Sequence, residues 1–173
     1  MTSESEGNLQ FHFPDEWPVL RYDACGFYRD RVEKCQDVKA VDFLLLARTG
    51  LVMIEVTDFR DFRIQTKLSL KNDGLAREFA AKVKDTIAGL YGAHRNENED
   101  LAPFCNYLFL QRPRKVKVIL LLEEDRPPSG HKSFKAIRSN LIMAINRRLR
   151  YLSVRCNVHC RRDVPSDYGW SVT

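Results

Sequence analysis

The sequence predicts an α/β fold, a three-layer α/β/α sandwich built around a central mixed sheet. Two kinds of segment favour this class. Some are short, continuously apolar runs of strand length, and others are longer stretches in which apolar residues recur every third or fourth position. They follow one another in the order α-β-β-extended-α-β-α-β. Continuously apolar strands are typical of a sheet that is buried on both faces, so helices are expected on both sides.

The composition is that of one globular domain. The chain has 173 residues, of which 44% are hydrophobic and 29% charged, and this length can bury a core without disulfides. We expect a flexible tail at residues 1–12 and a single domain at 13–173. No apolar stretch has membrane-spanning length, and the N-terminus lacks a secretory pattern. Five cysteines, an odd number, indicate reduced thiols and a cytoplasmic protein.

The first elements expected are a helix and a β-hairpin. Asp23 is a candidate N-cap for a helix whose apolar residues follow at short spacings, namely Ala24, Phe27, Tyr28, Val32 and Cys35. Two branched apolar runs come next, at residues 41–46 and 51–57, and residues 48–50 separate them. Such a pair of runs with turn residues between them is the pattern of a hairpin.

Two carboxylates stand at the open end of this hairpin. A two-residue turn at Thr49 and Gly50 would pair position 42 with position 57. Because side chains alternate along a strand, Asp42, Glu55 and Thr57 would then share one face. The neighbouring positions are apolar on both faces, so the two acids would be buried. Buried carboxylates are costly unless they are paired, protonated or bound to a cation.

This arrangement resembles the signature of the PD-(D/E)XK, or restriction-endonuclease-like, nuclease superfamily. That signature is an aspartate on one strand followed by Glu-x-Lys or Asp-x-Lys on the next, and Asp42 and Glu55-Val56-Thr57 correspond to it. Val41 stands in the place of the family's proline, and Thr57 in the place of its lysine. Residues 39–42 and 54–60 are also similar to an uncharacterised bacterial branch of this superfamily.

The resemblance implies a restriction-endonuclease-like domain with a Mg²⁺ site. Asp42 and Glu55 would be ligands of the ion, together with the carbonyl oxygen of Val56. Thr57 would stand beside the attacking water, where the family places its lysine. A hydroxyl carries no positive charge, so phosphodiester cleavage is expected to be weakened or lost unless another lysine takes that place.

A lysine from another element could replace the one missing from the motif. The candidates are Lys67, Lys71, Lys82, Lys84 and Lys117. Lys82 and Lys84 flank the apolar stripe of an expected helix, from which a long side chain could cross to the hairpin. Glu33, on the first expected helix, resembles the accessory acid that many members of the superfamily carry there.

The remaining elements alternate helix and strand. Residues 58–74 are expected to form a third strand or an extended crossing. Apolar residues recur at nearly every fourth position over 75–91, which predicts the clearest helix of the chain. A central buried strand is expected at 116–122, a helix at 133–149 and a last strand near 153–160.

Positive charge is concentrated in residues 112–162, which hold 14 Lys and Arg against 3 Asp and Glu. This segment has a net charge of +11, and the rest of the chain has −6. The asymmetry favours a polyanionic partner, and nucleic acid, DNA in particular, is expected. The residues expected to bind it are Arg147, Arg148, Arg150, Arg161 and Arg162. No membrane partner is expected, and the oligomeric state, a homodimer included, stays open.

Three functions are open at this level. The first is a nucleic-acid-binding domain in which Mg²⁺-dependent deoxyribonuclease activity is weakened or lost. The second is an active Mg²⁺-dependent nuclease with a relocated lysine, and the third is a non-catalytic α/β protein-interaction module. No zinc is expected, because Cys156 and Cys160 share a strand face from which His159 points away, and no second cysteine pair completes a tetrahedral site.

Overall fold

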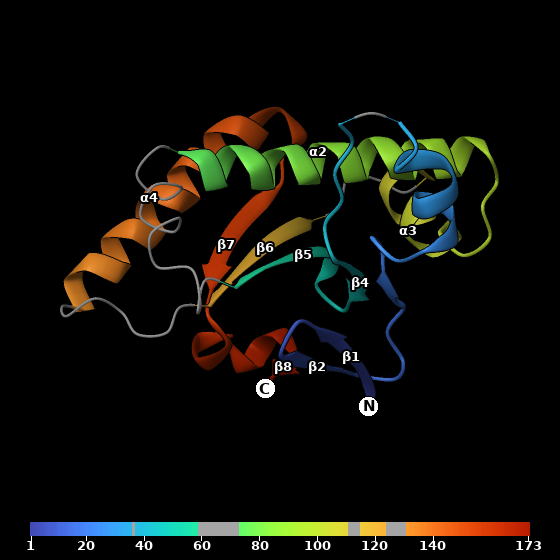
Figure 1. Cartoon of the computed structure of the whole chain (residues 1–173). Coiled ribbons are helices and arrows are strands. Elements are labelled where there is room, and N and C mark those ends of the chain that lie inside the picture. Colours follow the sequence, from blue (N-terminus) through green and yellow to red (C-terminus); the bar gives the residue numbers. More distant parts are fainter. Residues whose placement is uncertain (36, 59–72, 111–114, 124–130) are drawn as a thin grey trace.

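Two β-sheets and one layer of helices make up the protein (Figure 1). The computed structural model describes residues 1–35, 37–58, 73–110, 115–123 and 131–173. A mixed five-stranded sheet lies between helices on one face and a three-stranded sheet on the other. The expected α/β class is confirmed, with a different third layer.

The central sheet has the strand order β3-β4-β5-β6-β7. Its strands are β3 (Val19–Arg21), β4 (Phe43–Ala47), β5 (Gly50–Asp58), β6 (Val116–Glu123) and β7 (Arg155–His159). The β3–β4 and β4–β5 pairs are antiparallel, whereas the β5–β6 and β6–β7 pairs are parallel. The four strands expected in this sheet are confirmed, and β3 is an addition.

The β4–β5 hairpin differs from the expected register by two residues. Its turn lies at residues 48–49, and Phe43 pairs with Ile54. Continued along the strands, this register places Asp42 opposite Glu55, so the expected pairing of position 42 with 57 is wrong. A shift of two residues leaves every side chain on its own face, because the strand has a period of two. The two acids therefore remain on the same side of the sheet.

Helices cover one face of the central sheet (Figure 1). They are α2 (Gly74–Arg95), α3 (Ala102–Cys105), α4 (His131–Leu149) and the π-helix η2 (Asn106–Leu110). The apolar stripe of α2 packs on the side chains of this face, among them Leu44, Met53 and Val118. The helices expected at 75–91 and 133–149 are confirmed, and α2 continues to Arg95. α3 and η2 were not expected.

The helix expected after Asp23 is reduced to a five-residue π-helix, η1 (Tyr28–Val32). Asp23 does not cap it and instead accepts a hydrogen bond from Arg21 at 3.2 Å. Cys35, expected on an inward stripe, is exposed. Tyr28 is the buried residue of η1, and Phe27 and Val32 pack against the core while remaining partly exposed.

The second face of the central sheet carries a small sheet where helices were expected. Its order is β1-β2-β8, with β1 (Thr2–Glu6), β2 (Leu9–Phe13) and β8 (Ser171–Val172). Leu9, Phe11 and Phe13 alternate along β2 and are almost completely buried. They pack against a group on the central sheet that consists of Phe43, Leu45, Val52, Ile54, Ile119 and Leu121. A strand pair with one apolar side covers this face as a helix would, so the expected second helical layer is wrong.

The N-terminal segment is therefore a hairpin and not a flexible tail. Gly7 and Asn8 lie between Glu6 and Leu9, which pair with each other. Gly7 has a φ of +56°, a conformation that glycine adopts without strain and that two-residue hairpin turns require. This turn and the alternation in β2 are both visible in the sequence. The hairpin was nevertheless not predicted, because residues 1–7 are mostly polar and are typical of a flexible tail.

Of the segment expected at 58–74, residues 59–72 lie outside the described part of the chain. Short 3₁₀ turns complete the C-terminal part: η3 (Arg150–Leu152), η4 (Arg161–Asp163) and η5 (Ser166–Tyr168). Within the residues described, no helix combines the length and apolar character needed to cross a membrane.

The packing of β2 predicts that its aromatic residues are essential for stability. Phe11→Ala should lower the free energy of unfolding by about 3–5 kcal/mol, because it leaves a cavity between the two sheets. Gln10→Ala, at an exposed position of the same strand, should change it by less than about 0.5 kcal/mol. Urea denaturation monitored by circular dichroism measures both. Equal, small effects would mean that the hairpin is not part of the core.

Candidate active site

The open end of the β4–β5 hairpin holds Asp42 against β5. β4 begins at Phe43, which pairs with Ile54, whereas β5 continues past Ile54 to Asp58. Beyond that point the backbone N–H of Val56 donates to Asp42 Oδ2 at 2.7 Å. The carboxylate thus takes over as acceptor where the antiparallel pairing stops.

Both hairpin acids are buried, and burial shifts their titration. Asp42 is 8% exposed and Glu55 is 5% exposed. Burial raises the pKa of Asp42 to about 6, although the hydrogen bond from Val56 opposes the shift. Burial raises the pKa of Glu55 to about 8, and the charge of Asp42 adds to this effect. Two carboxylates in one water-poor site repel each other and favour an added cation.

Helix α2 brings a lysine to these acids. Lys82 Nζ lies 2.5 Å from Glu55 Oε1, and the lysine side chain is 22% exposed. Burial acts to lower the pKa of Lys82, but the charges of Glu55 and Asp42 outweigh it, so the pKa lies above its ordinary value. Lys82 therefore stays an ammonium ion at neutral pH.

The other candidate lysines do not reach this place as far as the structure describes them. Lys84 is exposed. Lys117 lies 4.8 Å from the centre of the Tyr168 ring. Lys67 and Lys71 fall outside the described residues. Of the described candidates, Lys82 is the one that contacts an acid of the motif.

A hydrogen bond fixes the position of α2 over the hairpin. The backbone N–H of Val41, next to Asp42, donates to Thr86 Oγ1 at 3.1 Å. Thr86 is completely buried and lies four residues after Lys82, so the two share one face of the helix. The backbone N–H of Lys39 also bonds to α2, at Asp85 Oδ2 over 3.0 Å. These contacts fix the position of α2 relative to the hairpin and therefore place Lys82 beside the two acids.

A pocket of about 250 Å³ opens beside Glu55. Its walls come from the end of β5 and the first turns of α2, and consist of Glu55, Val56, Thr57, Asp58, Leu75, Glu78 and Phe79. Thr57 is half-buried in this wall. All three residues expected from β5 for the site therefore line a single pocket.

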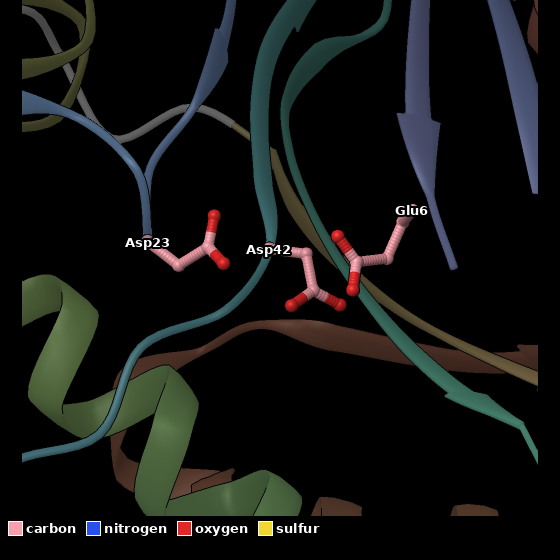
Figure 2. A group of neighbouring side chains, drawn as sticks. All are labelled: Glu6, Asp23 and Asp42. Carbon is pink, nitrogen blue, oxygen red and sulfur yellow. The ribbon is translucent and has the colours of Figure 1, made fainter.

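Two further acids, Glu6 and Asp23, lie close to Asp42. Carboxylate oxygens of Glu6, Asp23 and Asp42 all lie within 4.8 Å of one another. Figure 2 shows Asp42 between the other two, which come from different segments of the chain. Arg21 forms ion pairs with both Glu6 and Asp23. Sequence analysis missed these residues.

Glu33 was the accessory acid expected from the sequence, but it is exposed and is not part of this group. The prediction of an accessory acid on the first helix is therefore not met by Glu33. The turn and alternation pattern at residues 7–13 predicts a hairpin whose first strand ends at Glu6. This pattern was the sequence signal that could have identified Glu6 as part of a sheet.

The carboxylates suit a hard divalent cation such as Mg²⁺. Glu55 Oε2 is buried without a hydrogen-bond partner among the described groups, so one oxygen is available. The site also contains more acids than bases: four carboxyl groups face two cationic side chains, namely Glu6, Asp23, Asp42 and Glu55 with Arg21 and Lys82. Mg²⁺ binds through one or two carboxylates together with water. The residues therefore fit the ion.

Some of the expected nucleic-acid-binding arginines lie near the pocket. Arg147 and Arg148 contact Asp73 Oδ2 at 3.5 and 2.6 Å, and Asp73 precedes α2, two residues before Leu75 of the pocket wall. The backbone N–H of Arg161 donates to Glu123 at 2.6 Å.

The structure does not join all five arginines in one surface. Glu123 pairs with Asp58 of the pocket wall, which places Arg161 at the carboxyl end of the parallel strands. Arg162 is exposed in η4, beside Arg161. Arg150 lies in η3, before the start of β7, and is therefore at the opposite end of that strand.

No protein-family model matches this chain, and no curated protein or solved structure gives a match either.

The raised pKa of Glu55 predicts how stability depends on pH in a metal-free buffer. The folded protein binds the Glu55 proton more tightly than the unfolded chain does, so stability should fall as the pH rises from about 4.5 to about 8. One titrating group contributes a slope of at most about 1.4 kcal/mol per pH unit. Glu55→Gln should reduce the slope, whereas Glu33→Gln, at an exposed position that does not line the pocket, should leave it unchanged.

Urea midpoints measured in EDTA at several pH values would give these slopes. Equal slopes for the native protein and Glu55→Gln would contradict the burial of an ionisable Glu55.

Proposed function

We propose that the protein is a divalent-metal-dependent nuclease of the PD-(D/E)XK type in which Lys82 of α2 takes the place of the motif lysine. The observation that carries this proposal is the ion pair between Lys82 and Glu55, at 2.5 Å. It brings an ammonium group to a buried acid pair from a different element. Thr57 would then not weaken cleavage, because Lys82 would supply the positive charge that the motif lacks.

Each residue has a role that follows from its chemistry. Asp42 and Glu55 would hold Mg²⁺, with the carbonyl of Val56 as a further ligand. When bound, Mg²⁺ neutralises charge on the phosphate and makes a coordinated water more acidic. The Lys82 ammonium would orient the attacking water and stabilise the negative charge that develops on the phosphate oxygens. Thr57, in the pocket wall, could donate a hydrogen bond to the same water or to the substrate.

The nucleic-acid substrate is supported by charge. The acids of the site would repel a phosphate chain unless positive groups stood around them. Arg147 and Arg148 stand next to the first turn of α2, and Arg161 stands at the carboxyl end of β6. These groups could hold phosphates on either side of the pocket, without contributing sequence preference.

The strand arrangement also supports a restriction-endonuclease-like core. An antiparallel hairpin carries the acid pair, and two parallel strands extend the sheet from its second strand. A helix lies on the same face as the acids. The small β-sheet on the other face would be an addition to that core.

A nuclease assay with exchanged lysines tests the proposal. Purified protein is incubated with labelled DNA and Mg²⁺ or Mn²⁺, and Lys82→Met should lower the cleavage rate about 10²- to 10³-fold. Lys84→Met, at an exposed position of the same helix, should retain the native rate. Glu55→Gln should be as inactive as Lys82→Met.

Adding Thr57→Lys to Lys82→Met should restore at least about tenfold of the lost rate, because the ammonium then returns to the motif position beside the same acids. Native activity that survives both Lys82→Met and Glu55→Gln would refute the assignment. An inactive native protein that gains cleavage with Thr57→Lys would instead indicate a decayed site.

Metal binding can be tested without any cleavage. Isothermal titration with Mn²⁺ should show binding that Asp42→Asn and Glu55→Gln each weaken at least about tenfold. Binding should also release protons, because the raised pKa values leave these carboxyl groups partly protonated near neutral pH. The measured enthalpy should therefore vary with the ionisation enthalpy of the buffer. Glu33→Gln is the matched control, and equal weakening by it would contradict the site.

A further inference from the structure

The end of α4 and the following turn η3 expose a stripe of arginine side chains together with one methionine and one tyrosine. Met143 and Arg147 lie one turn apart on the same side of α4, and Arg150 and Tyr151 follow directly in η3. Met143 is 64% exposed and Tyr151 is 70% exposed. The side chain of Arg147 is 75% exposed. The start of β7 lies against α4, because the backbone N–H of Cys156 donates to Asn146 Oδ1 at 3.3 Å. We call the four residues, with the exposed Arg155 next to Cys156, the α4 stripe.

The cations of the α4 stripe are available for a ligand. The sequence contains no Asp or Glu between Asp125 and Asp163. Within the described ranges, no acid forms an ion pair with Arg150 or Arg155. Arg147 lies 3.5 Å from an Asp73 oxygen that Arg148 contacts at 2.6 Å. Because the two arginines share this one carboxylate, the charge of Arg147 is only partly compensated. Exposed, uncompensated arginines attract phosphate groups.

Tyr151 is exposed and has no aromatic partner among the described residues. The other strongly exposed tyrosine, Tyr91, packs edge-on against Phe109 with ring centroids 5.9 Å apart. Tyr151 makes no such ring contact with any described aromatic residue. A bare aromatic ring between arginines is the arrangement on which unpaired bases stack, with the arginines on the neighbouring phosphates. In a duplex the faces of the bases are covered by their neighbours, so this ring has nothing to stack on.

We propose that the α4 stripe binds single-stranded nucleic acid, with one base stacked on Tyr151 and the backbone held by Arg147, Arg150 and Arg155. This inference deepens the proposed nuclease function and rests on it for the nature of the substrate. Arg147 connects the stripe to the pocket, because it lies beside Asp73 at the start of α2. Arg150 and Arg155, at the far end of β7 from Arg161, then belong to this second binding surface. The substrate would carry an unpaired segment beyond the cleaved bond.

Fluorescence anisotropy in EDTA tests the binding separately from cleavage. The probes are labelled single-stranded DNA and RNA, the corresponding blunt duplexes, and an abasic oligonucleotide of the same length. Tyr151→Ala should weaken binding of the single strands about 5- to 100-fold, the range expected for the loss of one stacked base. It should leave binding of the duplex and of the abasic strand within about twofold.

Matched variants separate the ring from the charge. Tyr151→Phe keeps the ring and should bind single strands within about twofold of the native protein. Tyr91→Ala removes an exposed tyrosine elsewhere and should have no effect on binding. Arg150→Gln should weaken binding to all probes and reduce the dependence of affinity on salt by about one ion. Thermal melting checks that each variant is folded.

Two results would overturn the inference: equal loss on the abasic strand in Tyr151→Ala, or native affinity for duplex that matches or exceeds that for single strands. The first would mean that Tyr151 does not stack on a base. Failure of the nuclease proposal gives a different pattern, because stripe binding in EDTA would persist while no divalent ion supports cleavage.

Discussion

The burial of Asp42 and Glu55 at one end of the β4–β5 hairpin is the constraint on which the site depends. Each carboxylate loses most of its hydration. Burial raises the pKa of both, and the charge of Asp42 raises the pKa of Glu55 further. Such a pair is tolerated if the acids are protonated or if a compensating charge is close. Lys82 compensates one oxygen of Glu55, while the other oxygen has no partner among the described groups. Glu55 therefore keeps one buried oxygen that could accept a further ligand.

The fold holds the lysine in place through contacts that are themselves buried. Thr86 accepts the N–H of Val41, and that bond ties α2 to the residue next to Asp42. Lys82 lies one turn before Thr86 on the same side of the helix, so its side chain has a limited set of positions over the acids. A buried hydroxyl with a satisfied hydrogen bond is a more rigid anchor than apolar contact alone. Glu55 and Lys82 thus come from two regular elements, β5 and α2, and Asp42 lies in the segment directly before β4.

The N-terminal hairpin contributes to the core and to the charge arrangement together. β2 covers the second face of the central sheet with Phe11 and Phe13, while β1 ends at Glu6, close to Asp42. Arg21 connects the two sheets because it contacts Glu6, the carbonyl of Ser5 at 2.8 Å, and Asp23. The same arginine offsets part of the acidic charge around Asp42. Packing and electrostatics on this side of the protein are therefore coupled.

Local patterns determined most of the regular elements. The periodicity of apolar residues identified α2, α4 and four of the five strands of the central sheet, because each pattern repeats within one element. The shared face of Asp42 and Glu55 was also correct although the turn was misplaced, since a shift of two residues leaves strand faces unchanged. The departure at Thr57 was evident from the sequence, because it is a property of the motif itself.

Only the tertiary structure decided which side chains from other segments lie next to Asp42 and Glu55. Lys82 is 27 residues from Glu55 along the chain. From the sequence alone, Lys84 on the same helix is an equally good candidate to reach Glu55, because the packing angle of α2 is unknown. Glu6 and Asp23 reach Asp42 from separate segments, a relation that no local pattern contains. The third layer was likewise decided by the fold, because either a helix or an apolar strand pair can bury the same sheet face. Sequence periodicity determines which side of an element is buried, whereas long-range packing determines which side chains meet there.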